Sequence, residues 1–202
     1  MQEADFFQEE KGWVRVVHEV GFIARGCMEE WGRLYGNYSK TGCDMYKSLI
    51  VTYSEVGSVE ELAREDRALV ERAVEALNGA YAPYSGFSVG AALRLKDGTV
   101  VCGSNQENAA YPSGLCAERT AVFAASAQRP DMRDYEAIAI VGRNAEGELC
   151  EASPCGACRQ VLLEYEQLQG HPLRVICMLD GGKARVFAAV KDLLPFSFGF
   201  CQ

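Results

Sequence analysis

The apolar residues from position 45 onward follow two spacings, which alternate along the chain. Short apolar or alternating runs bounded by glycine, proline or aspartate are typical of strands, whereas apolar residues three and four positions apart are typical of a helix packed on one side. The runs predict strands over residues 47–53, 87–95, 99–103, 137–142, 173–179 and 184–190. The helical spacing predicts helices over residues 58–78, 115–127 and 155–165.

Short motifs mark the ends of these elements and suggest the fold class. Ser58 and Glu61 match a capping box, with Ser58 as N-cap of the first helix. Asp97-Gly98 lies between two apolar runs, which is a strong hairpin signal. The run at 137–142 is typical of a strand buried on both faces. A hairpin followed by alternating helices and strands predicts an α/β fold, a three-layer helix–sheet–helix arrangement with a mixed sheet of about five strands.

Residues 1–44 differ from the rest of the chain. They contain six glycines, both tryptophans and one of the two histidines, and their apolar residues fit helical spacing only loosely. Two interpretations stay open: the stretch is a genuine N-terminal extension, or the chain starts at Met45 and the upstream stretch is a mis-assigned extension. We favour the second, and we expect residues 45–202 to form the folded domain.

Composition and charge restrict the function classes. The chain has 202 residues, is 49% hydrophobic and carries a net charge of -8. The acidic balance disfavours a nucleic-acid partner, which usually meets a basic face. No apolar run reaches the roughly 20 residues that span a bilayer, and the N-terminus lacks the basic-then-apolar order of a secretory signal. We therefore expect a cytoplasmic protein with no membrane partner.

Three thiols carry the strongest chemical signal in the chain. Cys116, Cys155 and Cys158 can converge on one zinc ion and leave its fourth position open, which is typical of a catalytic zinc. Glu118 is well placed to handle the proton of a water at that position. Arg119 could hydrogen-bond the sulfurs and offset the charge of three thiolates. Both thiol groups fall at predicted helix starts, where the helix dipole favours the thiolate form.

Other interpretations of these residues stay open. The Cys-x-x-Cys pair could be half of a four-ligand structural zinc site completed by Cys150 or His171, or it could be a redox pair. Arg119 could form a surface or interface ion pair. The combination of Cys-Ala-Glu-Arg with Ser-Pro-Cys-x-x-Cys favours the catalytic site. The cysteines without a partner at ligand spacing are expected to be small buried hydrophobes or incidental surface thiols: Cys27, Cys43, Cys102, Cys150, Cys177 and Cys201.

At these motifs the chain resembles the cytidine deaminase family over about residues 58–200. The zinc-deaminase signature of that family includes a three-cysteine form and a glutamate that does not bind the metal. A thiol at Cys116, where many related deaminases carry histidine, resembles the short, homotetrameric branch. The resemblance implies one Zn²⁺ per subunit and a homotetramer with shared active sites. The matching stretches are residues 81–92, 103–112, 116–120, 153–160 and 193–195.

The resemblance also implies a reaction. Zinc lowers the pKa of its bound water and yields a hydroxide at neutral pH. Glu118 passes the proton to N3 of cytosine, the hydroxide attacks C4, and Glu118 moves a second proton to the departing ammonia. The implied function is hydrolytic deamination of cytidine or deoxycytidine to uridine or deoxyuridine, in pyrimidine salvage. Alternatively, Glu118 only complements the helix dipole.

Several further positions match substrate contacts of the family. Asn105 and Glu107 match the pair that holds the ribose 3′-hydroxyl, although an Asx-turn and a solvated carboxylate would explain them too. Phe87 would lie against the pyrimidine ring, or is a plain core residue. By resemblance, the N–H of Ala117 and the C=O of Ser153 would contact the O2 and amino edges of the base.

The C-terminal tail carries one more match. The family pattern Leu-Leu-Pro-Gly-x-Phe occurs here with Phe196 in place of glycine, and it ends at Phe198. Phe198 aligns with the aromatic residue that closes an adjacent subunit's pocket, and Tyr111 could reach a neighbouring subunit's site or simply pack. Because the change at 196 weakens the expected turn, Phe196, Phe198 and Phe200 could instead form an edge-strand or tail contact.

Three other functions compete with the deamination of a free nucleoside. Deamination of an altered aminopyrimidine nucleoside is disfavoured by the Asn105–Glu107 pair. Editing of polynucleotides is disfavoured by the acidic charge and by the lack of a basic aromatic groove. A zinc-stabilised binding module without activity is disfavoured because every catalytic residue type is present.

Overall fold

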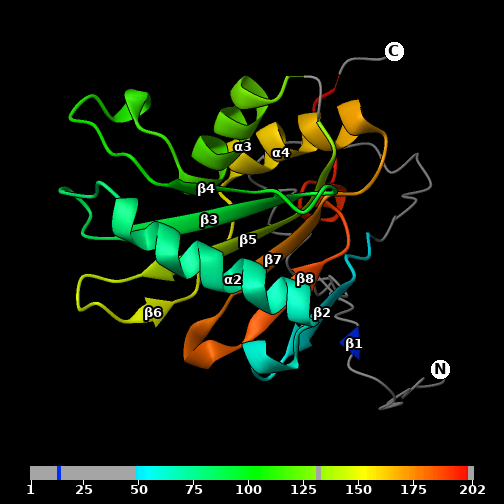
Figure 1. Cartoon of the computed structure of the whole chain (residues 1–202), viewed down its shortest axis with the longest axis horizontal. Helices are drawn as coiled ribbons and strands as arrows, with labels where there is room; N and C mark the ends of the chain where they lie inside the picture. Colours follow the sequence, from blue (N-terminus) through cyan, green and yellow to red (C-terminus); the bar gives the residue numbers. More distant parts are fainter. Residues whose placement is uncertain (1–12, 15–48, 131–132, 200–202) are drawn as a thin grey trace, which may run out of the picture. The chain divides into compact units, whose positions relative to one another are not determined.

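The fold is that of a computed structural model, which describes residues 13–14, 49–130 and 133–199 (Figure 1). The described strands form one sheet in the order β1–β2–β8–β7–β5–β3–β4, and β6 pairs with β5. The ladder between β5 and β7 is parallel, and the others are antiparallel. The strands are β1 (Trp13–Val14), β2 (Tyr53–Val56), β3 (Ser88–Leu95), β4 (Val100–Ser104), β5 (Tyr135–Arg143), β6 (Leu149–Cys150), β7 (Arg174–Met178) and β8 (Ala184–Phe187).

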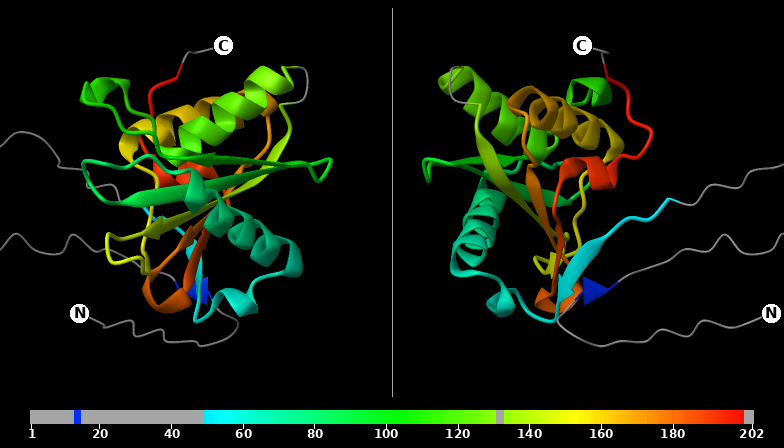
Figure 2. Two further views of the ribbon diagram at one scale, coloured as in Figure 1. Left: turned by 60° about the vertical axis from the view of Figure 1, so that its left-hand side comes forward. Right: turned by 90° about the vertical axis from the view of Figure 1, so that its right-hand side faces the viewer.

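Helices cover both faces of this sheet. Helix α2 (Arg64–Ala76) lies on one face, and α3 (Ala117–Gln128) and α4 (Gly156–Gln169) lie together on the other (Figures 1 and 2). Helix α4 is the crossover between the parallel strands β5 and β7, a connection that cannot be a tight turn. The predicted three-layer α/β fold with a mixed sheet is confirmed.

The sheet is wider than the five or so strands that we predicted. It has eight labelled strands, of which β1 and β6 are two residues long. Residues 47 and 48 of the strand predicted over 47–53 lie outside the described residues. For the described residues 49–53 the prediction was misplaced, because β2 begins only at Tyr53. Its partner strand β8 pairs with residues 54–56, whereas Leu49 and Ile50 are about half exposed. Among the described residues, no strand pairs with residues 49–52, and an apolar run alone does not extend a sheet.

The capping box at Ser58 predicted a helix start that the structure places later. The Ser58 hydroxyl accepts the N–H of Glu60 at 3.2 Å, but it caps a single 3₁₀ turn, η1 (Val59–Glu61). Helix α2 starts at Arg64, after an extended residue. Two arginines of the sheet hold its first turn in place. The Asp66 carboxylate accepts a hydrogen bond from Arg94 on β3 at 3.0 Å and one from Arg174 on β7 at 2.6 Å. Tertiary ion pairs therefore set this boundary.

The last predicted strand is also shorter than residues 184–190. Strand β8 ends at Phe187, and Val190 begins a 3₁₀ turn, η5 (Val190–Leu193). The buried Glu166 carboxylate on α4 accepts the N–H groups of Val190 at 2.7 Å and Lys191 at 3.1 Å. These N–H groups bond to a side chain and not to a strand, so the sheet stops before them.

A buried apolar layer joins α2 to the sheet. Leu69, Val70, Ala73 and Leu77 recur at helical spacing, which confirms the stripe expected from the sequence. They pack on apolar residues from four strands: Ala92, Ala137, Ala139, Val141, Ile176, Met178 and Ala184.

Two glycines in the hairpin strands let helices approach both faces of the sheet. A Cβ atom on Gly90 would lie 2.1 Å from the carbonyl oxygen of Ala73 in α2. A Cβ atom on Gly103 would lie 2.4 Å from the Ala121 nitrogen and 2.5 Å from the Ala117 oxygen in α3. Glycine at 103 is thus the residue that allows the first turn of α3 to rest on β4.

The predicted domain boundary falls largely outside the described residues. Of the predicted extension over 1–44, only β1 is described, and Trp13 and Val14 pair with β2. Cys27, Cys43, Phe200 and Cys201 also lie outside the described residues. Among the helices that the structure does describe, none combines the length and the apolar character that crossing a membrane requires.

Gly103→Ala is expected to destabilise the protein by about 1–3 kcal/mol, because the new methyl group must push α3 away from β4. Gly156→Ala is the matched control, since its Cβ would meet nothing within 4 Å. Urea unfolding followed by circular dichroism measures both. Equal unfolding midpoints for the two variants would contradict the close approach described here.

Candidate active site with a three-thiol metal centre

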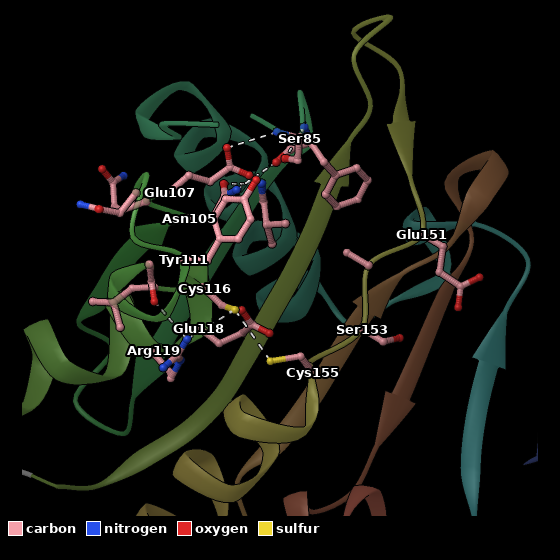
Figure 3. Close-up of a pocket in the computed structure, with 17 residues that line it drawn as sticks. Ser85, Asn105, Glu107, Tyr111, Cys116, Glu118, Arg119, Glu151, Ser153 and Cys155 are labelled. Atoms are coloured by element: carbon pink, nitrogen blue, oxygen red, sulfur yellow. Dashed lines mark hydrogen bonds between the residues drawn. The ribbon is translucent and has the colours of Figure 1, made fainter. Parts of the chain in front are cut away.

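A cavity of about 610 Å³ opens beside the N-terminal ends of α3 and α4 (Figure 3). Its wall comes from three parts of the chain that are far apart in sequence: the segment before β3, the loop after β4, and the segment before α4. Cys116, Glu118, Arg119 and Cys155 line it where the two helices begin. The cavity therefore joins the predicted metal ligands to the predicted substrate contacts.

The three predicted ligands lie together. Cys116 is the N-cap of α3, Cys155 is the N-cap of α4, and Cys158 lies in the first turn of α4. The Cys116 and Cys155 sulfurs are 3.7 Å apart, those of Cys155 and Cys158 are 3.5 Å apart, and all three lie within 4.8 Å of one another. A tetrahedral zinc with Zn–S bonds of about 2.3 Å separates its sulfurs by about 3.8 Å. The donor set fits zinc.

The proposed completion of a four-ligand structural site finds no support among the described residues. Neither Cys150 nor His171 belongs to the cluster of three thiols. The His171 ring instead contacts the Asp134 carboxylate and the Gln169 amide. Of the cysteines expected to be small buried hydrophobes, Cys177 is fully buried, and burial raises the pKa of its thiol to about 12.

The close contact shifts the pKa values of Cys116 and Cys158 in opposite directions. The hydrogen bond from Cys158, helped by the neighbouring Arg119 guanidinium, lowers the pKa of Cys116 to about 5. That hydrogen bond to Cys116, together with burial, raises the pKa of Cys158. A second thiolate beside the first is unfavourable unless a cation offsets it. Metal binding to thiols releases protons, because the thiolate is the form that binds the ion.

Arg119 contacts the thiol cluster through its guanidinium group. Its Nη2 lies 3.8 Å from the Cys116 sulfur and 3.5 Å from the Gly114 carbonyl oxygen. These partners are the sulfur and the backbone of the site itself. The guanidinium lies where its positive charge can stabilise negative charge on the Cys116 sulfur.

Glu118 is the buried acid of the site. It is the second residue of α3, and its side chain lies beside the sulfurs of Cys116 and Cys155 (Figure 3). Only 3% of the residue is exposed, and this burial, together with the negative charge at Cys116, raises the pKa of Glu118 to about 7. A carboxyl group with a pKa near neutrality can both accept and donate a proton at physiological pH.

Asn105 and Glu107 line the opposite wall. The Asn105 amide is fixed by the backbone before and within β3, because it accepts from Val89 N at 2.8 Å and donates to Phe87 O at 2.9 Å. Glu107 accepts the N–H groups of Tyr84 at 2.8 Å and Ser85 at 3.3 Å. Hydrogen bonds from the Ser85 side chain and from these N–H groups lower the pKa of Glu107, so that it is an ionised acceptor at neutral pH.

The structure brings only some of the remaining predicted contacts to the cavity. Phe87 and Ser153 line it. Ala117 is buried as the first residue of α3, a position whose N–H has no acceptor within a helix. Phe198 does not line this cavity. It is 69% exposed, and its carbonyl oxygen accepts from the Gln160 amide at 3.0 Å.

The comparisons with known proteins agree with this geometry. The chain matches the family described as "Cytidine and deoxycytidylate deaminase zinc-binding region" over residues 63–169, more than half of its length. A cytidine deaminase of Halalkalibacterium halodurans is 50% identical over 96 residues, which are 48% of this chain and 68% of that protein. One of Mycobacterium tuberculosis is 41% identical over 130 residues, which are 63% of this chain and 84% of that protein.

A solved structure of a cytidine deaminase also matches this chain. The crystal structure of cytidine deaminase from Burkholderia pseudomallei matches with a TM-score of 0.58 and 43% sequence identity, over 68% of this chain and 100% of that one. The chain belongs to the cytidine deaminase family. The family, the cytidine-deaminase-like fold and the zinc cofactor predicted from the sequence are thereby confirmed. The chain is an enzyme of the zinc-dependent deaminases.

Sequence reasoning missed some residues of this deaminase cavity. Ser85, Leu115 and Glu151 line it, although no motif in the sequence indicated a role for any of them. Ser85 lies inside a stretch that matches the family, and that match was the available signal. Glu151 follows strand β6, which is only two residues long and is too short to be predicted from alternating apolar residues. Tyr111, which we expected to pack or to reach a neighbour, lines the cavity rim, is 76% exposed and meets Tyr84 edge-on.

Removal of any thiol of the cluster is expected to abolish stoichiometric zinc binding, because two remaining sulfurs cannot hold the ion against a chelator. The variants are Cys116→Ala, Cys155→Ala and Cys158→Ala, and the measurement is zinc per chain after dialysis against a weak chelator. Cys102→Ala, a half-buried cysteine on β4 that lies outside the cluster, should keep one zinc per chain. Zinc retained in the three variants would show that other residues bind it.

Proposed function

We propose that this chain catalyses the hydrolytic deamination of cytidine and deoxycytidine to uridine and deoxyuridine, with release of ammonia. The observation that carries the proposal is the buried Glu118 carboxyl group beside a cluster of three thiols that fits zinc. The relatives to which the chain is similar are named cytidine deaminases.

Cys116, Cys155 and Cys158 would hold the metal. When bound, zinc supplies the Lewis acidity that makes water a nucleophile at neutral pH. Arg119 would keep the thiolates from cancelling that acidity, because its guanidinium already contacts the Cys116 sulfur at 3.8 Å.

Glu118 would carry both protons of the reaction. It accepts one proton from the attacking water and passes it to N3 of the cytosine ring, which makes C4 more electrophilic. The water oxygen bonds to C4, and Glu118 takes the second proton from that oxygen and gives it to the amino group at C4. The C4–N bond then breaks, the amino group leaves as ammonia, and a C4=O bond remains. A buried carboxyl group suits this exchange, because burial disfavours its ionised form and makes proton uptake easier.

The remaining wall residues would orient the nucleoside. Phe87 would lie against the pyrimidine ring, and the Ala117 N–H and Ser153 C=O would contact its polar edges. Asn105 and Glu107 would hold the ribose 3′-hydroxyl, for which an ionised carboxylate is a strong acceptor. The backbone bonds of Asn105 and Glu107 support this role, since a group that is already fixed loses little entropy when substrate binds.

The subunit arrangement is part of the proposal. We infer a homotetramer with shared active sites, in which Phe198 closes the cavity of an adjacent subunit and Tyr111 lies near a neighbour's site. The exposure of Phe198 away from its own cavity supports this arrangement. We also propose that the enzyme acts in the cytoplasm, in pyrimidine salvage.

Cytidine should be converted with a fall in ultraviolet absorbance and release of one ammonia per nucleoside. Glu118→Gln should keep its zinc but lose about 10²–10⁴-fold in kcat, because the amide cannot transfer protons. Glu164→Gln, an exposed residue of α4, is the matched control. Deoxycytidine, CMP and dCMP complete the substrate panel. Wild-type protein with full zinc and no turnover of any of these substrates would overturn the proposed function.

Glu107→Gln should lower kcat/KM for cytidine by about 10–100-fold, the range expected for one hydrogen bond to a charged group. The same substitution should change kcat/KM for 3′-deoxycytidine by less than about threefold, because that nucleoside lacks the hydroxyl group concerned. Steady-state rates on the two substrates provide the comparison. An equal loss on both would assign Glu107 to holding the loop at Tyr84 and Ser85 instead.

A further inference from the structure

Arg159 joins two backbone segments that are far apart in the sequence. It follows Cys158 directly in the first turn of α4. Its Nε donates to the Pro154 carbonyl oxygen at 2.8 Å, and its Nη1 donates to the Leu193 carbonyl oxygen at 3.1 Å. Both partners are backbone carbonyl groups. The side chain is therefore a bridge between the segment before α4 and the C-terminal turn η5.

The C-terminal end of this bridge is itself held in place. Glu166, buried on α4, accepts the N–H groups of Val190 and Lys191 in η5 and of Leu173 at 2.9 Å. Arg159 and Glu166 are seven residues apart on α4, and residues at this spacing lie on one face of a helix. Glu166 thus fixes the beginning of η5, and Arg159 fixes its end.

The other end of the bridge lies in the cavity wall. Residues 151–155 belong to no helix or strand, yet this segment contains Ser153 and the thiol of Cys155. Its backbone is also held on both sides of Ser153 and Pro154, because Ala152 N donates to Met178 O at 3.2 Å and Cys155 O accepts from Arg159 N at 2.9 Å. Pro154 has no N–H, so its carbonyl group is its one backbone hydrogen-bonding group. The bond from Arg159 sets the plane of the peptide between Pro154 and Cys155. A guanidinium suits this task, because its donors point in fixed directions.

We propose that Arg159 is a positioning residue for the segment 153–155, which it fastens to the C-terminal turn. Its side chain does not line the cavity. Through the Pro154 carbonyl it sets where the Cys155 sulfur and the Ser153 carbonyl point. The link to catalysis rests on the proposed function, whereas the link to the metal rests on the three-thiol cluster alone.

The test uses full-length, zinc-loaded protein and two readouts. The first is the rate at which excess colorimetric chelator removes zinc, and the second is kcat/KM for cytidine. Arg159→Gln should release zinc about 10–100-fold faster and lose about 10–100-fold in kcat/KM, the usual effect of removing a residue that orients a metal site. Arg159→Lys, which keeps the charge and one donor, should fall between this variant and wild type.

Arg174→Gln is the matched control for general loss of stability. Arg174 lies on β7 and donates to Asp66 at 2.6 Å, on the face of the sheet that α2 covers. The Arg174→Gln substitution should lower the thermal midpoint of unfolding. It should change the zinc-release rate and kcat/KM by less than about threefold. If Arg159→Gln does not fold, Arg159→Lys decides the question against the same control.

Either readout unchanged within twofold in Arg159→Gln would overturn the proposal, and so would the same result in Arg159→Lys if Arg159→Gln does not fold. Changes no larger than those of an equally destabilised Arg174→Gln would overturn it too. If the wild type deaminates no nucleoside, the proposed function fails by itself. The zinc-release comparison then decides the positioning role alone.

Discussion

Three sulfur atoms within 4.8 Å of one another are the constraint on which the rest of this site depends. Three thiolates so close together repel one another unless a cation lies between them, and three protonated thiols attract one another only weakly. The fold meets this constraint by directing the first turns of α3 and α4 at the same point. Their N-terminal N–H groups and the Arg119 guanidinium favour negative charge at that point. A zinc ion completes the charge balance.

This arrangement depends on packing far from the sulfurs. Helix α3 reaches its place because Gly103 leaves no side chain between it and β4. Helix α4 reaches its place as the crossover between the parallel strands β5 and β7. In the proposed role of Arg159, the C-terminal turn contributes as well, because it orients the backbone between Ser153 and Cys155. Several separate parts of the domain thus converge on one small volume.

Two carboxyl groups of the cavity experience opposite environments. Burial beside a thiolate raises the pKa of Glu118 to about 7, whereas hydrogen bonds from Ser85 and Tyr84 lower the pKa of Glu107. The first group can exchange protons at neutral pH, and the second remains an ionised acceptor. Such divergence between neighbouring acids separates the tasks of proton transfer and substrate binding. In the proposed reaction, these two acids act on the base and on the ribose.

Local sequence patterns determined the helix-sheet order, the hairpin at Asp97-Gly98 and the three thiols with their glutamate, because periodicity, turn chemistry and ligand spacing are properties of neighbouring residues. The same patterns gave three wrong boundaries: a strand over 47–53, a helix start at Ser58 and a last strand that reaches Val190. In each case the decisive partner, namely β8, the Arg94–Asp66 pair or Glu166, is distant in sequence. For the same reason, only the tertiary structure decided how deeply Glu118 is buried and that Arg159 bridges Pro154 to Leu193, since burial and long-range hydrogen bonds exist only once the chain has folded.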